Sequence, residues 1–213
     1  YSHVCRPGKV KSGWIGQNCP GVEVRISSEG EVLVRSEATM QGYFKEPGKT
    51  AETLTLDGSL RTGDKGEQDE EGNLRLTGRI KEIFKTSKGK FVAPAPIENR
   101  MAVDTRLEQI CVVGEGMVQP LAICVLSDAG RSAANGEGRI ELESALRALL
   151  EQINGELDKH EQLRGIVLVK DVWAVENGYL TPTLKIKRAV IESSYGKHFD
   201  DWLQRCDAVL WQE

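Results

Sequence analysis

The stretch of residues 60–98 constrains the fold most, because signals for turns, strands and a helix start follow one another there in a fixed order. It reads LRTGDKGEQDEEGNLRLTGRIKEIFKTSKGKFVAPAPIE. Arg61-Thr62-Gly63-Asp64 predicts a tight turn that presents one carboxylate. The predicted strand after the acidic loop ends in Gly78-Arg79-Ile80-Lys81. It is followed by a hairpin turn with the sequence Lys-Gly-Lys and by a helix start with the sequence Pro-Ala-Pro. The order predicts a β-rich segment that gives way to a second unit near Arg79.

The residues before Arg79 show the two-residue alternation of half-buried strands. The predicted elements are strands over residues 22–26, 31–35, 60–62 and 73–77, a short helix starting near Pro47, and an acidic turn over residues 64–72. Residues 1–17 carry little periodicity and predict extended or loop structure. Together they predict a small β-rich domain with one helical insert, residues 1–78.

The residues from Arg79 onward mix short apolar runs with helical spacing. The predicted elements are a hairpin around residues 87–89, a helix with Pro96 in its first turn, central strands over residues 110–114 and 121–126, a loop over 127–138, a helix over 140–159, a strand over 163–169, a loop over 179–182, and helices over 186–195 and 199–210. Strands interleaved with helices predict a separate α/β domain, residues 79–213. The predicted fold class is therefore α+β.

Charge and hydropathy narrow the class of protein. The chain has 28 basic and 32 acidic side chains and a net charge of −4, which gives no case for a basic nucleic-acid-binding surface. A composition of 39% hydrophobic and 28% charged residues is typical of a soluble globular protein. No apolar run approaches the ~20 residues of a membrane span. Peripheral association with a membrane stays open.

The cysteine and histidine pattern does not predict a metal site. Cys111 and Cys124 lie in apolar strand-like runs, where a buried thiol is expected. The other three cysteines are scattered (Cys5, Cys19 and Cys206), which fits a reducing cytoplasm. The three histidines (His3, His160 and His198) are isolated, and Trp202 and Trp211 are expected to be packing residues.

Four segments stand in an order that carries a family resemblance. They are Gly42-Tyr43 with Pro47 and Thr50, Arg61-Thr62-Gly63-Asp64, Gly78-Arg79-Ile80-Lys81 with Gly89 and Glu98, and Thr183-Leu184-Lys185-Ile186-Lys187-Arg188. This order resembles the acyl-adenylate-forming superfamily, which comprises acyl-CoA synthetases, luciferases and the adenylation domains of peptide synthetases. The sequences of two segments, KTSKGKFVAPAPIEN and LTPTLKIKR, are most similar to those of long-chain fatty acyl-CoA synthetases. Leu184 stands where the family usually has Gly.

The resemblance implies an activity and its substrates. In such an enzyme a fatty acid and Mg-ATP give acyl-AMP and pyrophosphate, and the CoA thiol then gives acyl-CoA and AMP. The chain shows neither a Ser/Thr/Gly-rich phosphate loop ending in Lys nor an aromatic-Gly-x-Thr-Glu motif. We therefore expect a C-terminal fragment, inactive in adenylation alone, with Mg²⁺ bound mainly by upstream residues and the small domain mobile.

The resemblance also assigns roles in the first half of the chain. Asp64 would bind the two ribose hydroxyls of ATP and of the adenylate, although a single Asp after Gly is more often a turn residue bonding its own backbone. Arg79 would contact the ribose or the α-phosphate, or else be a solvated strand-end charge. Lys81 would be the hinge about which the small domain turns.

In the second half, Lys88 and Gly89 would face the pantetheine of CoA, where a residue without Cβ permits close approach. The ordinary alternative is a charged hairpin tip. Lys185 would be catalytic, because an ammonium group stabilises charge that develops on the α-phosphate. Lys187 is the rival for that role, and Arg188 is the trailing Arg of the motif.

Two other functions stay open at this point. The chain could be a non-catalytic nucleotide-binding or interaction module of the same fold. It could also belong to an enzyme that adenylates amino or aryl acids and feeds a carrier protein. The presence of Asp64, Arg79 and Lys185 together disfavours the non-catalytic module. The sequence upstream of Tyr1 would distinguish that module from an acyl-CoA synthetase.

Overall fold

The computed structural model describes residues 2–136, 138–205 and 207–212, and the chain divides into two compact units, residues 1–83 and residues 84–213. The first unit consists mainly of strands, whereas the second combines helices with a sheet. This organisation confirms the predicted α+β class. The domain boundary predicted between residues 78 and 79 falls in the last strand of the first unit and stays a prediction.

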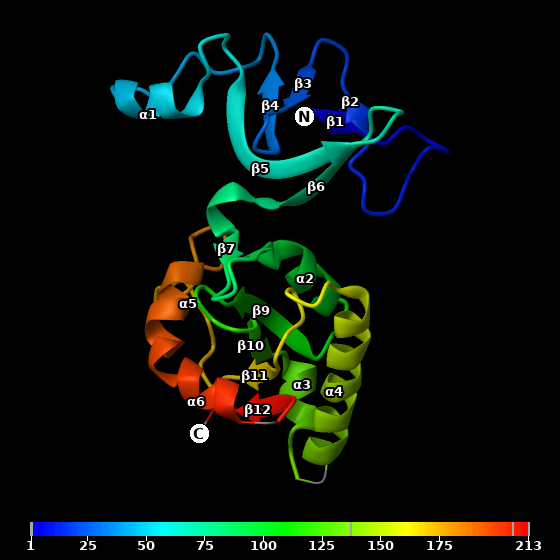
Figure 1. Cartoon of the computed structure of the whole chain (residues 1–213), viewed down its shortest axis with the longest axis vertical. Helices are drawn as coiled ribbons and strands as arrows, with labels where there is room; N and C mark the ends of the chain where they lie inside the picture. The colour runs from blue at the N-terminus through cyan, green and yellow to red at the C-terminus, as the bar shows by residue number, and fades with distance from the viewer. Residues whose placement is uncertain (1, 137, 206, 213) are drawn as a thin grey trace. The chain divides into compact units, whose positions relative to one another are not determined.

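A four-stranded antiparallel sheet forms most of the first unit (Figure 1, blue to teal). Its strands, in spatial order, are β3 (Glu23–Ile26), β4 (Glu31–Arg35), β5 (Leu60–Gln68) and β6 (Leu74–Arg79). The unit also contains the strand pair β1 (His3–Val4) and β2 (Gln17–Asn18), helix α1 (Pro47–Thr53) and the 3₁₀ helix η1 (Ile80–Glu82). Val32, Leu33 and Leu74 are buried in it.

The hairpin of β3 and β4 and the start of α1 confirm the sequence prediction. Val24 and Val34 are partners in the ladder, and the amide of Gly30 donates to the carbonyl of Ser27 at 2.9 Å in the connecting turn. Helix α1 begins at Pro47, where the missing amide hydrogen costs no helical hydrogen bond.

The predicted turn at Arg61-Thr62-Gly63-Asp64 is wrong, because this motif lies inside strand β5. Gly63 has a φ of +72°, and the ladder shifts register just before Gly66. The strand therefore bends at a bulge and continues, as the curved β5 in Figure 1 shows. A Cβ on Gly66 would lie 2.7 Å from Cγ2 of Val32 and 3.0 Å from the carbonyl oxygen of Arg75, so the bend needs glycine there. The acidic turn is confined to residues 69–73.

The second unit is built on a four-stranded mixed sheet. In spatial order its strands are β12 (Val209–Trp211), β11 (Ile166–Leu168), β10 (Leu121–Leu126) and β9 (Leu107–Val113). Strands β10, β11 and β12 are parallel, and β9 runs antiparallel to β10. The other elements are the hairpin β7 (Phe84–Lys85) and β8 (Phe91–Val92), helices α2 (Pro94–Met101), α3 (Asp128–Ala133), α4 (Gly138–Glu156), α5 (Arg188–Tyr195) and α6 (Phe199–Gln204), and the 3₁₀ helix η2 (Gly196–His198).

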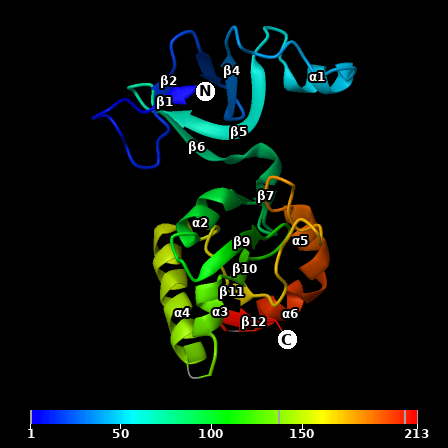
Figure 2. The same ribbon diagram turned by 180° about the vertical axis from the view of Figure 1, so that it is seen from behind.

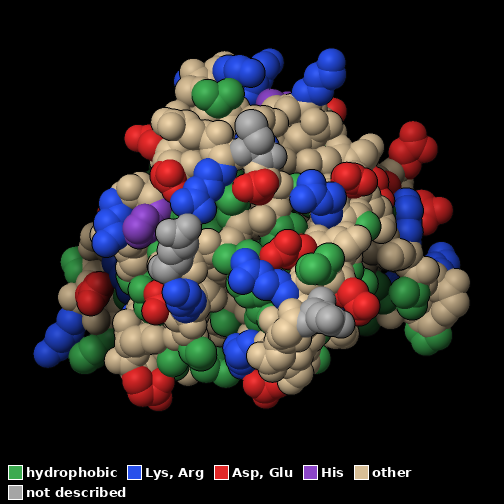
Figure 3. Space-filling view, turned by 90° about the horizontal axis from the view of Figure 1, so that it is seen from below, with side chains coloured by type: hydrophobic (Ala, Val, Ile, Leu, Met, Phe, Trp, Pro, Cys, Tyr) green, Lys and Arg blue, Asp and Glu red, His purple; other side chains and the backbone are tan. Residues whose placement is uncertain are grey.

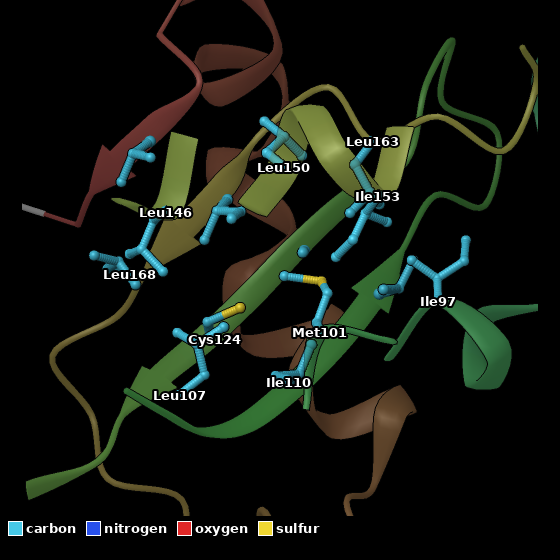
Figure 4. Close-up of a cluster of buried hydrophobic side chains, with 14 of the residues drawn as sticks. Ile97, Met101, Leu107, Ile110, Cys124, Leu146, Leu150, Ile153, Leu163 and Leu168 are labelled. Atoms are coloured by element: carbon cyan, nitrogen blue, oxygen red, sulfur yellow. The ribbon is translucent and has the colours of Figure 1, made fainter. Parts of the chain in front are cut away.

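Helices cover both faces of this sheet, with α2, α3 and α4 on one face and α5 and α6 on the other (Figures 1 and 2). Alternate strand residues point to opposite faces. Cys124 belongs to the core under α2 and α4, and Cys111 to the core under α5 and α6. Figure 4 shows Met101 of α2 and Leu146 of α4 converging on the first of these cores.

Three predictions in the second unit are wrong. Strand β9 lies at an edge of the sheet, so only β10 of the two strands is central. The loop predicted over residues 127–138 contains helix α3, because the Ser127 side chain caps it by accepting a hydrogen bond from the Gly130 amide at 3.1 Å. The terminal helix ends at Gln204, and Leu210 lies in strand β12, whose carbonyls and amides pair with β11.

The packing predictions are confirmed where the structure describes the residues. Cys111 and Cys124 are both buried. Trp202 is buried, and His198 stacks on it with ring centroids 5.3 Å apart. The Trp211 indole donates to Glu143 at 2.6 Å. Cys206 lies outside the described residues.

Candidate functional site

Strands β5 and β6 bring Asp64 and Arg79 together. The two residues are direct partners in the ladder, and Nε of Arg79 lies 3.0 Å from Oδ1 of Asp64. The Asp64 side chain is 25% exposed and that of Arg79 is 54% exposed, so both can be reached from solvent. A carboxylate that accepts hydroxyl hydrogen bonds thus stands beside a guanidinium that can donate to phosphate oxygens.

A buried carboxylate holds the backbone next to Asp64. Glu31, at the start of β4, is only 6% exposed. Its Oε1 accepts from the Gly63 amide at 3.0 Å, and its Oε2 lies 3.1 Å from Nη1 of Arg61. The Thr62 hydroxyl accepts from the Asp64 amide at 3.1 Å and donates to the Val32 carbonyl in β4 at 2.7 Å. These bonds fix the left-handed Gly63 and thereby the direction of the Asp64 side chain.

Sequence reasoning missed Glu31. In the alternating pattern of β4 it is typical of a solvent-facing charge at a strand start. The signal that could have found it is its opposite charge to Arg61 in the neighbouring predicted strand. Partners with opposite charge across adjacent strands would have placed this carboxylate beside the Arg61-Thr62-Gly63-Asp64 motif.

Lys81 lies in the 3₁₀ turn η1, directly after the strand that carries Arg79. Its side chain is exposed. Backbone torsions on both sides are extended, at φ −112° and ψ 133° for Arg79 and φ −69° and ψ 123° for Ile83, and the Ile83 amide donates to the Arg79 carbonyl at 3.1 Å. A single short helical turn therefore separates two extended residues, which is a place where few torsions need change to redirect the chain.

Lys88 and Gly89 form the exposed tip of the β7–β8 hairpin, as predicted. Gly89 has a φ of +74° and its amide donates to the Thr86 carbonyl at 2.9 Å. Thr86 is buried and also pairs through its amide with the Lys90 carbonyl at 2.9 Å. The tip is thus a tight turn that needs glycine, with lysines on either side.

Lys185 lies on an exposed turn between two paired backbone segments. The amide of Leu184 donates to the Thr181 carbonyl at 2.8 Å, and the amide of Lys185 donates to the Thr181 hydroxyl at 3.0 Å. At the base of the turn, Leu180 and Ile186 form a β-bridge. Leu184 has a φ of +60° and is 71% exposed. The position where the family usually has Gly is therefore a left-handed one, which explains that preference.

Arg188 and Glu98 form a clamp directly after the Lys185 turn. Nη1 of Arg188 lies 2.8 Å from Oε1 of Glu98, and the two side chains are 15% and 17% exposed. The same Nη1 donates to the Val112 carbonyl at 2.5 Å, and Glu98 accepts from the Val112 amide at 2.8 Å. Two residues noted in separate motifs thus join α2, β9 and the start of α5.

The predicted site residues divide between the two units. Asp64, Arg79 and Lys81 belong to the first, and the Lys88-Gly89 tip and Lys185 belong to the second. Among residues 2–136, 138–205 and 207–212, no group of three or more His, Cys, Asp or Glu side chains could hold a metal ion. In the same part of the chain, no helix is both long and apolar enough to cross a membrane. Basic and acidic side chains are interspersed on the face drawn in Figure 3.

A comparison with protein families shows to which family the chain belongs. The family described as the AMP-binding enzyme C-terminal domain matches residues 81–206. The chain belongs to this family. Its match begins at Lys81 and includes the Lys88-Gly89 tip and Lys185.

Relatives with similar sequences are long-chain-fatty-acid–CoA ligases. Long-chain-fatty-acid–CoA ligase 1 is 36% identical in Cavia porcellus and 32% identical in Homo sapiens, over 92% of this chain and 32% of each relative. Long-chain-fatty-acid–CoA ligase FadD15 of Mycobacterium tuberculosis is 31% identical over 90% of this chain and 34% of its own length. The chain spans about a third of the length of these relatives.

Solved structures share the fold. The A domain of a carboxylic acid reductase from Segniliparus rugosus, in complex with AMP and a carboxylic acid, matches with a TM-score of 0.71 and 25% identity over 88% of this chain and 32% of that one. The amide bond synthetase McbA from Marinactinospora thermotolerans matches with a TM-score of 0.63 and 28% identity over 86% of this chain and 36% of that one. The shared fold is therefore found in proteins with different names, a carboxylic acid reductase and an amide bond synthetase.

Proposed function

We propose that this chain is the C-terminal part of a long-chain fatty acyl-CoA synthetase. In the first half-reaction a fatty carboxylate attacks the α-phosphate of ATP, the bond to the β-phosphate breaks, and acyl-AMP and pyrophosphate result. In the second, the sulfur of CoA attacks the acyl carbon, AMP leaves, and the thiol proton is released. The long-chain-fatty-acid–CoA ligases among the relatives support this substrate class.

The observation that carries the proposal is the pairing of Asp64 with Arg79 at 3.0 Å across β5 and β6, in a chain of the AMP-binding family. We assign Asp64 to the two ribose hydroxyls, because a carboxylate can accept both hydrogen bonds at once. Arg79, whose Nε holds Asp64 in place, keeps further N–H donors for the ribose or the α-phosphate. Binding of the nucleotide thus uses a geometry that the ladder fixes in advance.

Lys185 acts in the adenylation step. Its ammonium group, on the exposed turn, stabilises negative charge that develops on the α-phosphate oxygens during attack. The Lys88-Gly89 tip acts in the second step, where a turn without Cβ admits the pantetheine arm. The two steps need different parts of the second unit. Lys81, in its single helical turn, is the hinge about which the second unit turns from one step to the next.

ATP and CoA are substrates in this scheme, and Mg²⁺ neutralises the triphosphate when it is bound. We assign Mg²⁺ to the triphosphate and to the upstream residues that the family resemblance implies. The residues of this chain hold the ribose and the α-phosphate and supply charge.

A second candidate is activation of an aryl or amino acid, because solved relatives of the same fold include a carboxylic acid reductase and an amide bond synthetase. ATP–pyrophosphate exchange by the full-length protein, across fatty acids of increasing chain length and aryl and amino acids, separates the candidates. We expect exchange that depends on long-chain fatty acids. Exchange only with aryl or amino acids would replace the substrate class, and none with any acid would favour a non-catalytic nucleotide-binding module.

A further inference from the structure

A buried tyrosine hydroxyl links residues 171–173, which precede the Lys185 turn in the chain, to helix α5, which follows the turn. Tyr195, at the end of α5, is 2% exposed. Its hydroxyl donates to Oδ2 of Asp171 at 2.8 Å and accepts from Nε1 of Trp173 at 3.2 Å. Burial raises the pKa of Tyr195 above its ordinary value, so the phenol stays neutral and can both donate and accept. Segment 171–173 is thereby bonded to α5.

The ring of Tyr195 in turn supports the base of the Lys185 turn. Tyr179 stacks on Tyr195 with ring centroids 6.2 Å apart and an interplanar angle of 14°. The Tyr179 carbonyl accepts from the Lys187 amide at 2.9 Å, which closes the base of the turn. Leu180, the next residue, is 4% exposed and belongs to the same core as Tyr195. The turn therefore stands on the aromatic cluster at its base.

The tip of the turn contrasts with this base. Leu184, next to Lys185, is 71% exposed and left-handed. The lysine side chain is long and flexible, so the place of its ammonium group depends on where the base of the turn is held. A misplacement of about 1 Å can cost on the order of 10²-fold in rate, even from a change far from the reacting atoms.

We propose that Tyr195 is a positioning residue for adenylation, and that its hydroxyl, bonded to Asp171 and Trp173, sets the placement of the Lys185 turn through Tyr179. The proposal rests on the function proposed above for Lys185. It goes beyond packing, since removal of one oxygen atom from a retained ring should affect only the half-reaction that uses Lys185.

Tyr195→Phe in the full-length protein tests this, because it keeps the stacked ring and removes the hydroxyl together with its bonds to Asp171 and Trp173. Two single-turnover rates are measured, pyrophosphate release and thioester formation from pre-made acyl-AMP. We expect pyrophosphate release to fall by about tenfold and thioester formation to change by less than about twofold. In a Lys185→Ala background, Tyr195→Phe should lower pyrophosphate release no further, since positioning matters only for a group that is present.

Trp202→Phe is the matched control. Trp202 packs against Tyr195 at 6.2 Å between centroids, and its replacement disturbs the same cluster without touching the hydroxyl. It should lower the thermal midpoint without separating the two rates. If Tyr195→Phe does not fold, Asp171→Ala removes the exposed acceptor instead and should separate the two rates in the same direction.

Equal slowing of both half-reactions by Tyr195→Phe, or a full tenfold loss that persists without Lys185, would overturn the positioning role while the role of Lys185 stands. No loss of pyrophosphate release in Lys185→Ala would overturn the role assigned to Lys185, and the positioning role with it, whereas the proposed function itself fails only if the full-length protein shows no exchange with fatty acids. The failures are therefore distinguishable.

Discussion

Asp64 lies inside a β-ladder, where Arg79 is its direct partner and the buried Glu31 fixes the adjacent backbone. Lys185 lies on an exposed turn, held by backbone pairing at its base and next to a left-handed leucine. In the proposed mechanism, the group that would bind the nucleotide through both half-reactions lies on a sheet, and the group that would act in only one half-reaction lies on a turn. We infer that the backbone hydrogen bonding around each residue follows the number of steps that the residue would serve.

Removal of the lysine side chains tests the turn most strongly. Lys185→Ala should lower single-turnover pyrophosphate release by roughly 10²–10³, the scale for loss of one group that stabilises transition-state charge. Thioester formation from pre-made acyl-AMP should be largely intact, because no phosphoryl transfer occurs in it. Lys187→Ala is the control, since its side chain is exposed and its backbone bond is retained. The reverse pattern in these two variants would move the catalytic role to Lys187.

Glu31→Ala tests the sheet side of the comparison. The change leaves the Gly63 amide and the Arg61 guanidinium without this partner, which should cost roughly 1–3 kcal/mol of unfolding free energy. Thermal unfolding of the full-length protein measures the cost, and both half-reactions should slow together because Asp64 would serve both in the proposed mechanism. Glu29→Ala, at an exposed position in the preceding turn, should change neither. Selective slowing of one half-reaction by Glu31→Ala would contradict the comparison.

Lys81→Pro tests whether the unit that carries Lys185 must move relative to the unit that carries Asp64. Proline disfavours a helical conformation at the residue before it, and Ile80 lies in the 3₁₀ turn. The substitution should fix one orientation of the second unit, and we expect transfer to CoA to fall by about tenfold more than pyrophosphate release. Lys81→Ala leaves the torsions free and removes only an exposed side chain, so both rates should change little. Equal losses in the two variants would mean that the side chain matters and the hinge does not.

The sequence predicted those elements whose signals are local. Helix α1 follows from its first proline, and the β3–β4 hairpin follows from alternation around a turn. The order of motifs likewise predicted that Asp64 and Arg79 belong to one site. Helix α3 was missed because small polar residues favour a loop locally, while a serine cap and burial of Gly130 favour the helix.

Long-range pairing could not be predicted in the same way. The bend of β5 depends on how closely Gly66 approaches β4 and β6, and strand β12 depends on its pairing with β11. Glu31 and Tyr195 were missed for the same reason, because their partners lie far away in sequence. The pairing of Glu98 with Arg188 shows that a motif residue can owe its place to the fold as well as to chemistry.

Leu184→Gly should have the smallest effect, and it tests whether the turn is strained. A left-handed conformation costs an L-residue roughly 1–2 kcal/mol, whereas glycine loses about 0.5–1 kcal/mol through its freer unfolded state. Since the leucine side chain is 71% exposed, little packing is lost, and a net gain of about 0.5 kcal/mol in unfolding free energy is expected. Leu184→Ala keeps the positive φ and should give no gain. If alanine stabilises as much as glycine does, exposure of the leucine side chain is what costs stability. If glycine destabilises, the cost of its freer unfolded state exceeds any strain that the left-handed backbone stores at this position.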